Sequence, residues 1–164
     1  MDCKMQQAGA ASDAFAHPRV GVAAIIQRRD GKIIVGQRKS SHGAGTIQLP
    51  GGHLEFGEPF FLCAERETLE ETGLRVRGTK LVAVTNDVFG DLGKHYITIF
   101  VRCELEDADA EPVNIEPEKC GGWSWVTWDE VRAINEAAKA GQGAKLFLPL
   151  QQLVEQNPDI ETSC

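Results

Sequence analysis

Residues 52–74 read GHLEFGEPFFLCAERETLEETGL, and the rest of the chain can be interpreted outward from this stretch. Glu58 and Pro59 stand where a helix would begin, because proline is tolerated in the first turn and a carboxylate complements the positive end of the helix dipole. Gly73 is typical of the residue that ends a helix, since glycine adopts the left-handed conformation without strain. The stretch therefore predicts a helix over Pro59–Thr72.

The predicted helix carries three glutamates on one face. Glu67, Glu70 and Glu71 stand at i, i+3 and i+4, which places them within about 100° of arc. Their mutual repulsion costs roughly a few tenths of a kcal/mol per pair, and a hard divalent cation with oxygen ligands would offset it. A solvated acidic face, with Arg66 and Arg75 as partners, is the alternative interpretation. The residues on the opposite side, which we expect to face the core, are Phe61, Leu62, Thr68 and Leu69.

Patterns on both sides of this helix predict a mixed sheet. Asp30-Gly31 lies between two runs rich in valine and isoleucine, and such a pair predicts a hairpin because both residues tolerate positive φ. Strands before and after a central helix favour an α/β fold with helices on the faces of a mixed β-sheet. The expected strands are Val20–Arg29, Lys32–Arg38, Ile47–Leu49, Lys80–Asn86, Tyr96–Leu105 and Trp123–Thr127, and the further helices are Trp128–Ala140 and Leu148–Gln156.

The length and composition indicate one ordinary globular domain. The chain has 164 residues, of which 42% are hydrophobic and 25% are charged, so it can bury a core without disulfides. We expect a disordered segment at 1–17, a single domain at 18–156 and a flexible tail at 157–164.

The charge and cysteine content exclude several classes of protein. A net charge of −7 disfavours broad binding of nucleic acid, which needs a basic face, although divalent cations can mediate binding of a polyphosphate. The five cysteines are scattered without a C-x-x-C pair, which predicts reduced thiols and a cytoplasmic protein. No apolar run approaches the ~18 residues that span a bilayer, so we expect no membrane partner.

The stretch at 52–74 resembles the 23-residue Nudix box. The positions that carry the resemblance are Gly52, Glu58, Arg66, Glu67, Glu70, Glu71, Gly73 and Leu74. Thr68 departs from the pattern, because the family usually has an aliphatic residue there. The resemblance implies a Nudix α/β/α sandwich with a central mixed β-sheet, and a hydrolase that uses Mg²⁺ or Mn²⁺.

The resemblance also assigns roles to individual residues. The implied metal ligands are the carbonyl of Gly52 and the carboxylates of Glu67, Glu70 and Glu71. Arg66 would hold the carboxylates in place, and Glu58 would brace the loop against the helix. Glu67 is the favoured general base, with Glu70 as the alternative. Glu116 and Glu118 lie where the family often supplies another carboxylate, and they can equally be solvated loop charges.

Two further segments look like the eukaryotic MutT-type branch of that family, whose members include diphosphatases of purine nucleoside triphosphates. These segments are 48–58 and 114–119. By matching positions, Arg38 would contact phosphates, and Gln48 and Thr98 would line the pocket. Phe147 and Leu148 would form a wall where relatives have Trp in place of Leu148. Trp123, Trp125 and Trp128, in contrast, are expected to be core or sheet-surface aromatics.

The resemblance implies a hydrolase that releases a nucleoside monophosphate and diphosphate, with modified purine nucleotides such as oxidised dGTP among its substrates. Another organic diphosphate, either a dinucleotide cofactor or an isoprenyl diphosphate, is the alternative substrate. A binding module without catalysis is less favoured, because the box glutamates are all present. The expected partner is thus a small nucleotide or organic diphosphate, and a homodimer is possible.

Overall fold

The computed structural model describes residues 17–163, so nearly all of the segment predicted to be disordered, 1–17, lies outside the described residues. The strands are β1 (Arg19–Ile26), β2 (Ile33–Arg38), β3 (Ile47–Gln48), β4 (Gly51–His53), β5 (Val76–Phe89), β6 (Lys94–Leu105) and β7 (Cys120–Val126). The helices are α1 (Phe60–Thr72), the 3-10 turn η1 (Gly90–Leu92), α2 (Trp128–Lys139), α3 (Leu148–Gln156) and α4 (Ile160–Ser163). Each predicted helix therefore forms within one residue of its expected bounds.

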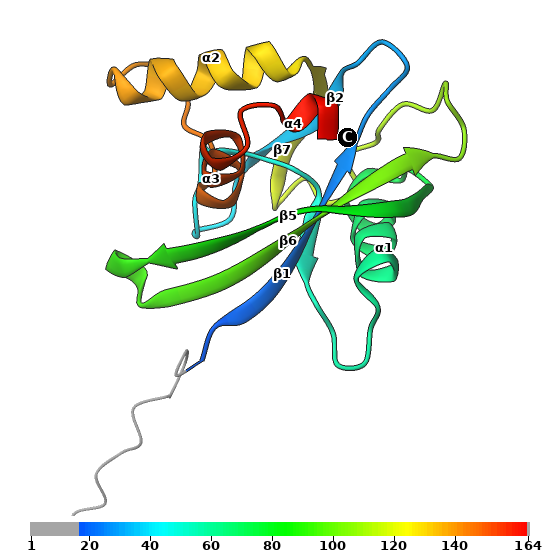
Figure 1. The fold of residues 1–164 in the computed structure, drawn as a ribbon, viewed down its shortest axis with the longest axis horizontal. Helices are drawn as coiled ribbons and strands as arrows, with labels where there is room; N and C mark the ends of the chain where they lie inside the picture. Colours follow the sequence, from blue (N-terminus) through cyan, green and yellow to red (C-terminus); the bar gives the residue numbers. More distant parts are fainter. Residues whose placement is uncertain (1–16, 164) are drawn as a thin grey trace, which may run out of the picture.

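The strands form two sheets. The larger sheet has the order β4-β1-β6-β5 and is mixed, because β1 runs parallel to β6 whereas β4 and β5 are antiparallel to their neighbours. The smaller sheet, β3-β2-β7, is antiparallel. Helix α1 covers one face of the larger sheet, and α2 and α3 lie on the other side (Figure 1). The predicted α/β sandwich with a mixed sheet is confirmed.

The hairpin predicted at Asp30-Gly31 is confirmed only close to its turn, where the Arg28 N–H also donates to the Lys32 carbonyl. Gly31 has a φ of 82° and its N–H donates to the Arg28 carbonyl. Beyond a single bridge between Gln27 and Ile33, however, β1 and β2 separate into different sheets. Strand β1 instead pairs with β4 and β6, and β2 pairs with β3 and β7, all of which come later in the chain.

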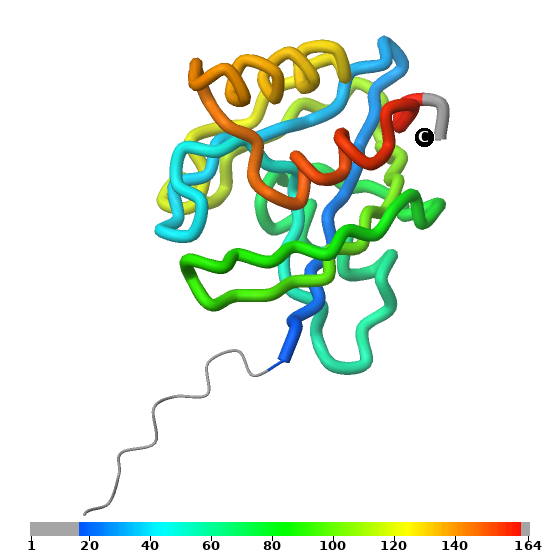
Figure 2. The backbone as a smooth tube through the Cα atoms, turned by 60° about the vertical axis from the view of Figure 1, so that its left-hand side comes forward, coloured from blue at the N-terminus to red at the C-terminus, as the bar shows by residue number. Residues whose placement is uncertain are grey.

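Two core clusters lie on opposite sides of the larger sheet. One cluster joins the sheets to α2 and α3 through residues such as Phe100, Val131 and Leu153. The other lies beneath α1 and includes Ile34 and Val101. Figure 2 shows α3 and the chain after it packed over the long β5–β6 ribbon. The sheet is thus held on both faces, which gives α1 a rigid support.

The prediction for the buried face of α1 is wrong in part. Leu62 and Leu69 are 53% and 39% exposed, whereas Thr68 is buried as expected. The buried stripe consists of small side chains, among them Cys63 and Ala64. On a helix of 100° per residue this stripe also contains positions 67 and 71, so two of the glutamates lie toward the protein rather than away from it.

The packed part of the chain extends beyond residue 156. Helix α4 lies within the segment expected to be a flexible tail, and Ile160 is 1% exposed in the first core cluster. The longest helix between residues 17 and 163 is α1, with 13 residues, and none of the helices in that range could span a bilayer.

Candidate active site

A cavity of about 550 Å³ lies on the larger sheet, between the N-terminal end of α3 and the glutamate face of α1. Its volume is within the range of small-molecule sites. The predicted metal ligands that line it are Gly52, Glu67, Glu70 and Glu71, and the predicted substrate residues that line it are Arg38, Gln48, Thr98 and Phe147. The structure therefore brings together eight positions that are spread over more than 100 residues of sequence.

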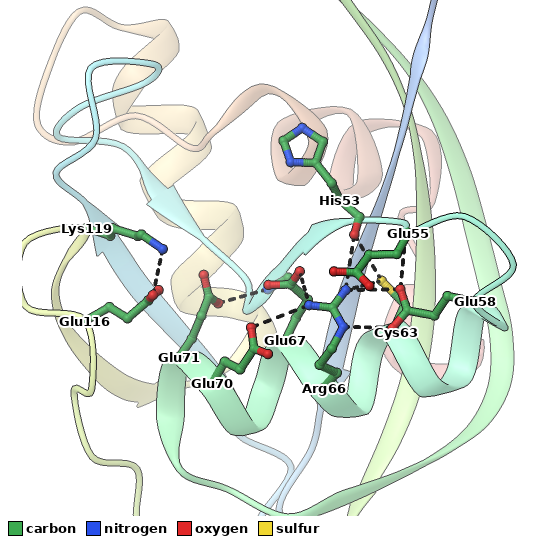
Figure 3. Close-up of polar contacts among 11 residues, drawn as sticks. His53, Glu55, Glu58, Cys63, Arg66, Glu67, Glu70, Glu71, Glu116 and Lys119 are labelled. Carbon is green, nitrogen blue, oxygen red and sulfur yellow. Dashed lines mark hydrogen bonds and ion pairs between the residues drawn. The ribbon is translucent and has the colours of Figure 1, made fainter.

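Arg66 organises the carboxylates at the α1 end of the cavity (Figure 3). Its guanidinium donates to Glu58 at 2.8 and 3.0 Å, to Glu67 at 2.8 Å and to Glu70 at 3.4 Å. It also donates to the carbonyl oxygen of His53 at 3.2 Å. The contact with Arg66 lowers the pKa of Glu58 to about 2. Arg66 and Glu58 thus tie the loop after β4 to α1.

Two glycines allow this loop to approach α1 closely. Gly51 has a φ of 153°, and a Cβ atom there would lie 2.2 Å from the carbonyl oxygen of Val22. A Cβ atom at Gly52 would lie 2.3 Å from the carboxyl carbon of Glu67. Neither position can accept a side chain without a shift of its neighbours, so the backbone at Gly52 and the Glu67 carboxylate are held next to each other.

Burial dominates the electrostatics of the two inner glutamates. It raises the pKa of Glu71 to about 8, with Glu67 and Glu116 adding to the shift, although the Gly51 N–H donates to Glu71 at 3.0 Å. Burial also raises the pKa of Glu67, and Arg66 acts in the opposite direction. Burial therefore disfavours the charged form of both inner carboxylates, whereas Glu70 is 57% exposed.

A hard divalent cation fits this set of groups. Several carboxylate oxygens close together are the kind of ligand that Mg²⁺ and Mn²⁺ accept. Between residues 17 and 163 no three carboxylate, imidazole or thiol groups already converge on one point. Arg66 instead occupies the space beside Glu67 and Glu70.

The acidic loop before β7 contributes one of its two candidate carboxylates. Glu116 lines the cavity and its charge acts on Glu71, whereas Glu118 does not line it. Lys119, which also lines the cavity, donates to Glu116 at 2.6 Å. The loop therefore places one carboxylate and one ammonium group opposite α1, and only the carboxylate was singled out from the sequence.

Arg38 is a cation that lines the cavity. Its guanidinium donates to the side-chain oxygen of Gln48, to the carbonyl of His42 at 3.0 Å and to the Ser40 hydroxyl at 3.0 Å. It also lies over the ring of Phe147, with 4.1 Å between Cζ and the ring centroid. Because these contacts fix its position, Arg38 presents a pre-oriented cation to the cavity.

An aromatic cluster lines part of the cavity. Phe89 and Phe147 are stacked at 5.5 Å between centroids, and His42 contacts both rings edge-on. Tyr96 lies next to Phe89 at 6.0 Å. The sequence predicted only Phe147 among these four residues. His42 comes from the loop after β2, Phe89 from the end of β5 and Tyr96 from the start of β6. These segments are far from Phe147 in the sequence, so no local pattern identifies the three residues.

The wall predicted at Leu148 is wrong. Leu148 does not line the cavity, whereas Phe147, Pro149 and Leu150 do. Phe147 is the N-cap of α3 and Leu148 is its first helical residue, and side chains one position apart do not share a face of a helix. The tryptophans are also absent from the cavity lining: Trp128 is buried, and Trp123 and Trp125 pack against the second core cluster.

Comparison with known proteins gives consistent matches. A family model described as the NUDIX domain matches residues 17–150. The ADP-ribose pyrophosphatase of Methanocaldococcus jannaschii is 38% identical over 85 residues, which cover 52% of this chain and 50% of that protein. A MutT-like protein of Streptomyces ambofaciens is 31% identical over 116 residues, which cover 68% of this chain and 66% of that protein. The chain thus spans between half and two-thirds of the length of these curated relatives.

A solved structure with a similar fold is that of a MutT NUDIX hydrolase from Burkholderia pseudomallei. It has a TM-score of 0.60 and 30% sequence identity, and the match covers 69% of this chain and 85% of that chain.

Proposed function

The chain belongs to the NUDIX domain family, and from that premise we propose that it is a divalent-metal-dependent hydrolase that cleaves the diphosphate linkage of nucleoside diphosphate-linked substrates. The observation that carries the proposal is the position of Glu67 and Glu71. Both carboxylates lie on the inner face of α1, line the cavity and have pKa values raised by burial. Such groups are typical of catalytic sites.

The residues at the α1 end would hold the metal and activate water. Glu67, Glu70, Glu71 and the carbonyl of Gly52 would bind Mg²⁺ or Mn²⁺, which neutralises phosphate charge and lowers the pKa of bound water. Glu67 is the proposed general base, because its pKa is raised by burial while Arg66 holds it in place. Glu70 is the alternative base. The side chain of Glu70 is more exposed than that of Glu67, so its carboxylate can adopt more orientations.

Other residues that line the cavity would position the substrate. The Arg38 cation would bind the phosphates, because a guanidinium matches the geometry of phosphate oxygens. Phe147 and Phe89 would contact the group that the diphosphate carries, and Gln48 and Thr98 would form its polar contacts. The reacting phosphate would then lie at the α1 end, next to the carboxylates.

We propose nucleoside triphosphates, including modified purine nucleotides, as the preferred substrates. The aromatic cluster and the polar side chains beside it match a nucleobase, which has both a flat apolar face and hydrogen-bonding edges. The archaeal relative is named for its action on ADP-ribose, so a dinucleotide-like diphosphate is the second candidate. The relatives described above are archaeal and bacterial, and they give no support to a eukaryotic MutT-type branch.

The test is a substrate panel with purified protein, in which products are separated by chromatography. The panel contains canonical and oxidised purine triphosphates, ADP-ribose, a dinucleotide cofactor and an isoprenyl diphosphate, each with Mg²⁺, Mn²⁺ or excess chelator. We expect a nucleotide to be cleaved fastest, and turnover to stop in chelator. Equal turnover in chelator would overturn the metal requirement, and cleavage of the isoprenyl diphosphate alone would overturn the substrate class.

A further inference from the structure

A carboxyl group lies directly behind the cavity wall and takes no part in the proposed reaction. Asp87 on β5 is 0% exposed, and its Oδ2 atom accepts the Thr98 hydroxyl at 2.6 Å and the Thr85 hydroxyl at 2.9 Å. The other oxygen of Asp87 is buried and has no partner among the residues that the structure describes. Burying such a group costs free energy unless hydrogen bonds compensate, so packing alone does not explain an aspartate at this position.

The register of β5 and β6 places these side chains on the cavity face of the sheet. Thr85 pairs with Thr98 and Asp87 pairs with Tyr96, and paired residues of antiparallel strands point to the same face. Thr98 and Tyr96 line the cavity, whereas Thr85 and Asp87 do not. Asp87 can therefore act on a ligand through Thr98 and not by direct contact.

The direction of the hydrogen bonds among Thr85, Asp87 and Thr98 follows from which of these side chains can donate. Burial raises the pKa of Asp87, whereas the two threonine hydroxyls, which both donate to its Oδ2 atom, favour the charged form, and an ionised carboxylate has no hydrogen to donate. A threonine hydroxyl has a single hydrogen, and once Thr98 has donated it to Asp87, only its lone pairs are left for the cavity. Thr98 is thereby converted from a group that could donate or accept into one that only accepts.

A second side chain in the cavity, that of Gln48, is also held in one orientation by a hydrogen bond. Arg38 donates to the side-chain oxygen of Gln48, and arginine has no acceptor of its own. The oxygen of that amide must therefore face Arg38, which leaves the amide nitrogen of Gln48 as its donor for a ligand. The cavity thus offers an acceptor at Thr98 and a donor at Gln48, both residues being 6% exposed.

We propose that Asp87 is a positioning residue that holds the Thr98 hydroxyl as an acceptor, so that the site selects bases with an N–H donor at that point. This inference rests on the proposed function, because it concerns how the same cavity recognises a nucleobase. A base with a carbonyl or an unprotonated ring nitrogen there would bring two acceptors together. A buried acceptor without a donor is disfavoured, so the discrimination is about tenfold in affinity.

The test compares ligands that differ by one donor. The ligands are the α,β-methylene triphosphates of purine riboside, adenosine, inosine and 2-aminopurine riboside. The first has no N–H on its six-membered ring. Adenosine and 2-aminopurine riboside each add an amino group, at C6 and C2, and inosine adds an N–H at N1 together with a carbonyl oxygen at C6. Their affinities for the full chain are measured by calorimetry with Mg²⁺, and the unmodified triphosphates are assayed for hydrolysis in parallel.

The variants separate positioning from a structural role. Thr98→Val removes the acceptor and Asp87→Ala frees the Thr98 hydroxyl to rotate. Thr98→Ser keeps the acceptor, and Thr85→Val removes the second hydroxyl bound to Asp87 but leaves the Thr98 contact in place. We expect at least one added N–H to strengthen binding to the wild type about tenfold, and this gain to disappear in the first two variants but remain in the other two. Thermal unfolding of each variant reports on the fold.

The possible results lead to different conclusions. If the wild type binds all four ligands equally, or binds none of them, the inference is overturned. The same holds if Asp87→Ala weakens binding of all four ligands by one common factor, since that result indicates a merely structural role. If the expected pattern of binding occurs but no unmodified triphosphate is hydrolysed, the proposed function fails while the role of Asp87 stands.

Discussion

Substitution of Gly52 by alanine should separate catalysis from folding. The added Cβ atom would lie 2.3 Å from both the carboxyl carbon and Oε1 of Glu67, whereas an ordinary contact is 3.4–4 Å. The obstructing atoms belong to the end of a flexible side chain, so we expect the Glu67 carboxylate to retreat by about 1 Å while the backbone stays in place. A displacement of about 1 Å in a catalytic group can lower a rate by about 100-fold.

The expected consequence is a large loss of kcat with little loss of stability. A factor of 100 corresponds to about 2.7 kcal/mol in the activation barrier. The backbone at Gly52 is not in the left-handed region, so the free energy of unfolding should change by less than about 1 kcal/mol. The assay is the steady-state rate of nucleotide hydrolysis with Mg²⁺, together with chemical denaturation of the same preparation.

Two other glycines provide matched controls. A Cβ atom at Gly90 would meet nothing within 4 Å, so Gly90→Ala should preserve both rate and stability. At Gly51 the obstructing atom is the backbone oxygen of Val22, and Gly51→Ala should therefore lower the free energy of unfolding by about 2 kcal/mol or more. A Gly52→Ala variant that keeps the wild-type rate would refute the reasoning, as would one that is destabilised as much as Gly51→Ala.

Three further predictions concern the carboxylates and the cavity wall. Glu71→Gln should lower kcat by about 100-fold or more. In chelator at pH 8 this variant should unfold no more easily than the wild type, because the substitution removes a buried charge. A variant with wild-type activity would contradict the proposed role of Glu71. Phe147→Ala should weaken nucleotide binding several-fold in calorimetry, whereas Leu148→Trp should leave it unchanged. The reason is that Phe147 lines the cavity and Leu148 does not. For Glu58, the folded pKa of about 2 lies below the ordinary 4.5, so its stabilisation is present above pH 4.5 and is lost as the pH falls toward 2. Denaturation curves of wild type and Glu58→Gln should therefore converge over that range, and a constant difference would count against the Arg66–Glu58 contact.

The sequence predicted the helices well because their ends carry local signals. Pro59 is the N-cap of α1, and Gly73 ends the helix with a φ of 71°. Thr127 and Glu130 form a capping box at the start of α2. These features depend on residues a few positions apart, so they are readable without tertiary information.

The predictions that failed depend on packing between distant segments. The outer face of α1 keeps Leu62 and Leu69 exposed, because its inner face packs small residues next to the glutamates. The assumption that apolar side chains mark the buried face therefore does not hold at a site that must keep carboxylates inside. In the same way, His42 and Phe89 meet Phe147 only because the loop after β2 and the end of β5 converge on α3.

The most direct test of the central claim is isotope labelling of the products. The preferred nucleotide is incubated with the wild-type chain and Mg²⁺ in water enriched in ¹⁸O, and the products are analysed by mass spectrometry. If the chain is a diphosphate hydrolase that uses the carboxylates of α1, one ¹⁸O atom should enter one phosphate product, and Glu67→Gln should suppress its formation by about 100-fold or more. Phosphate products without ¹⁸O, or equal labelling by Glu67→Gln, would contradict the account.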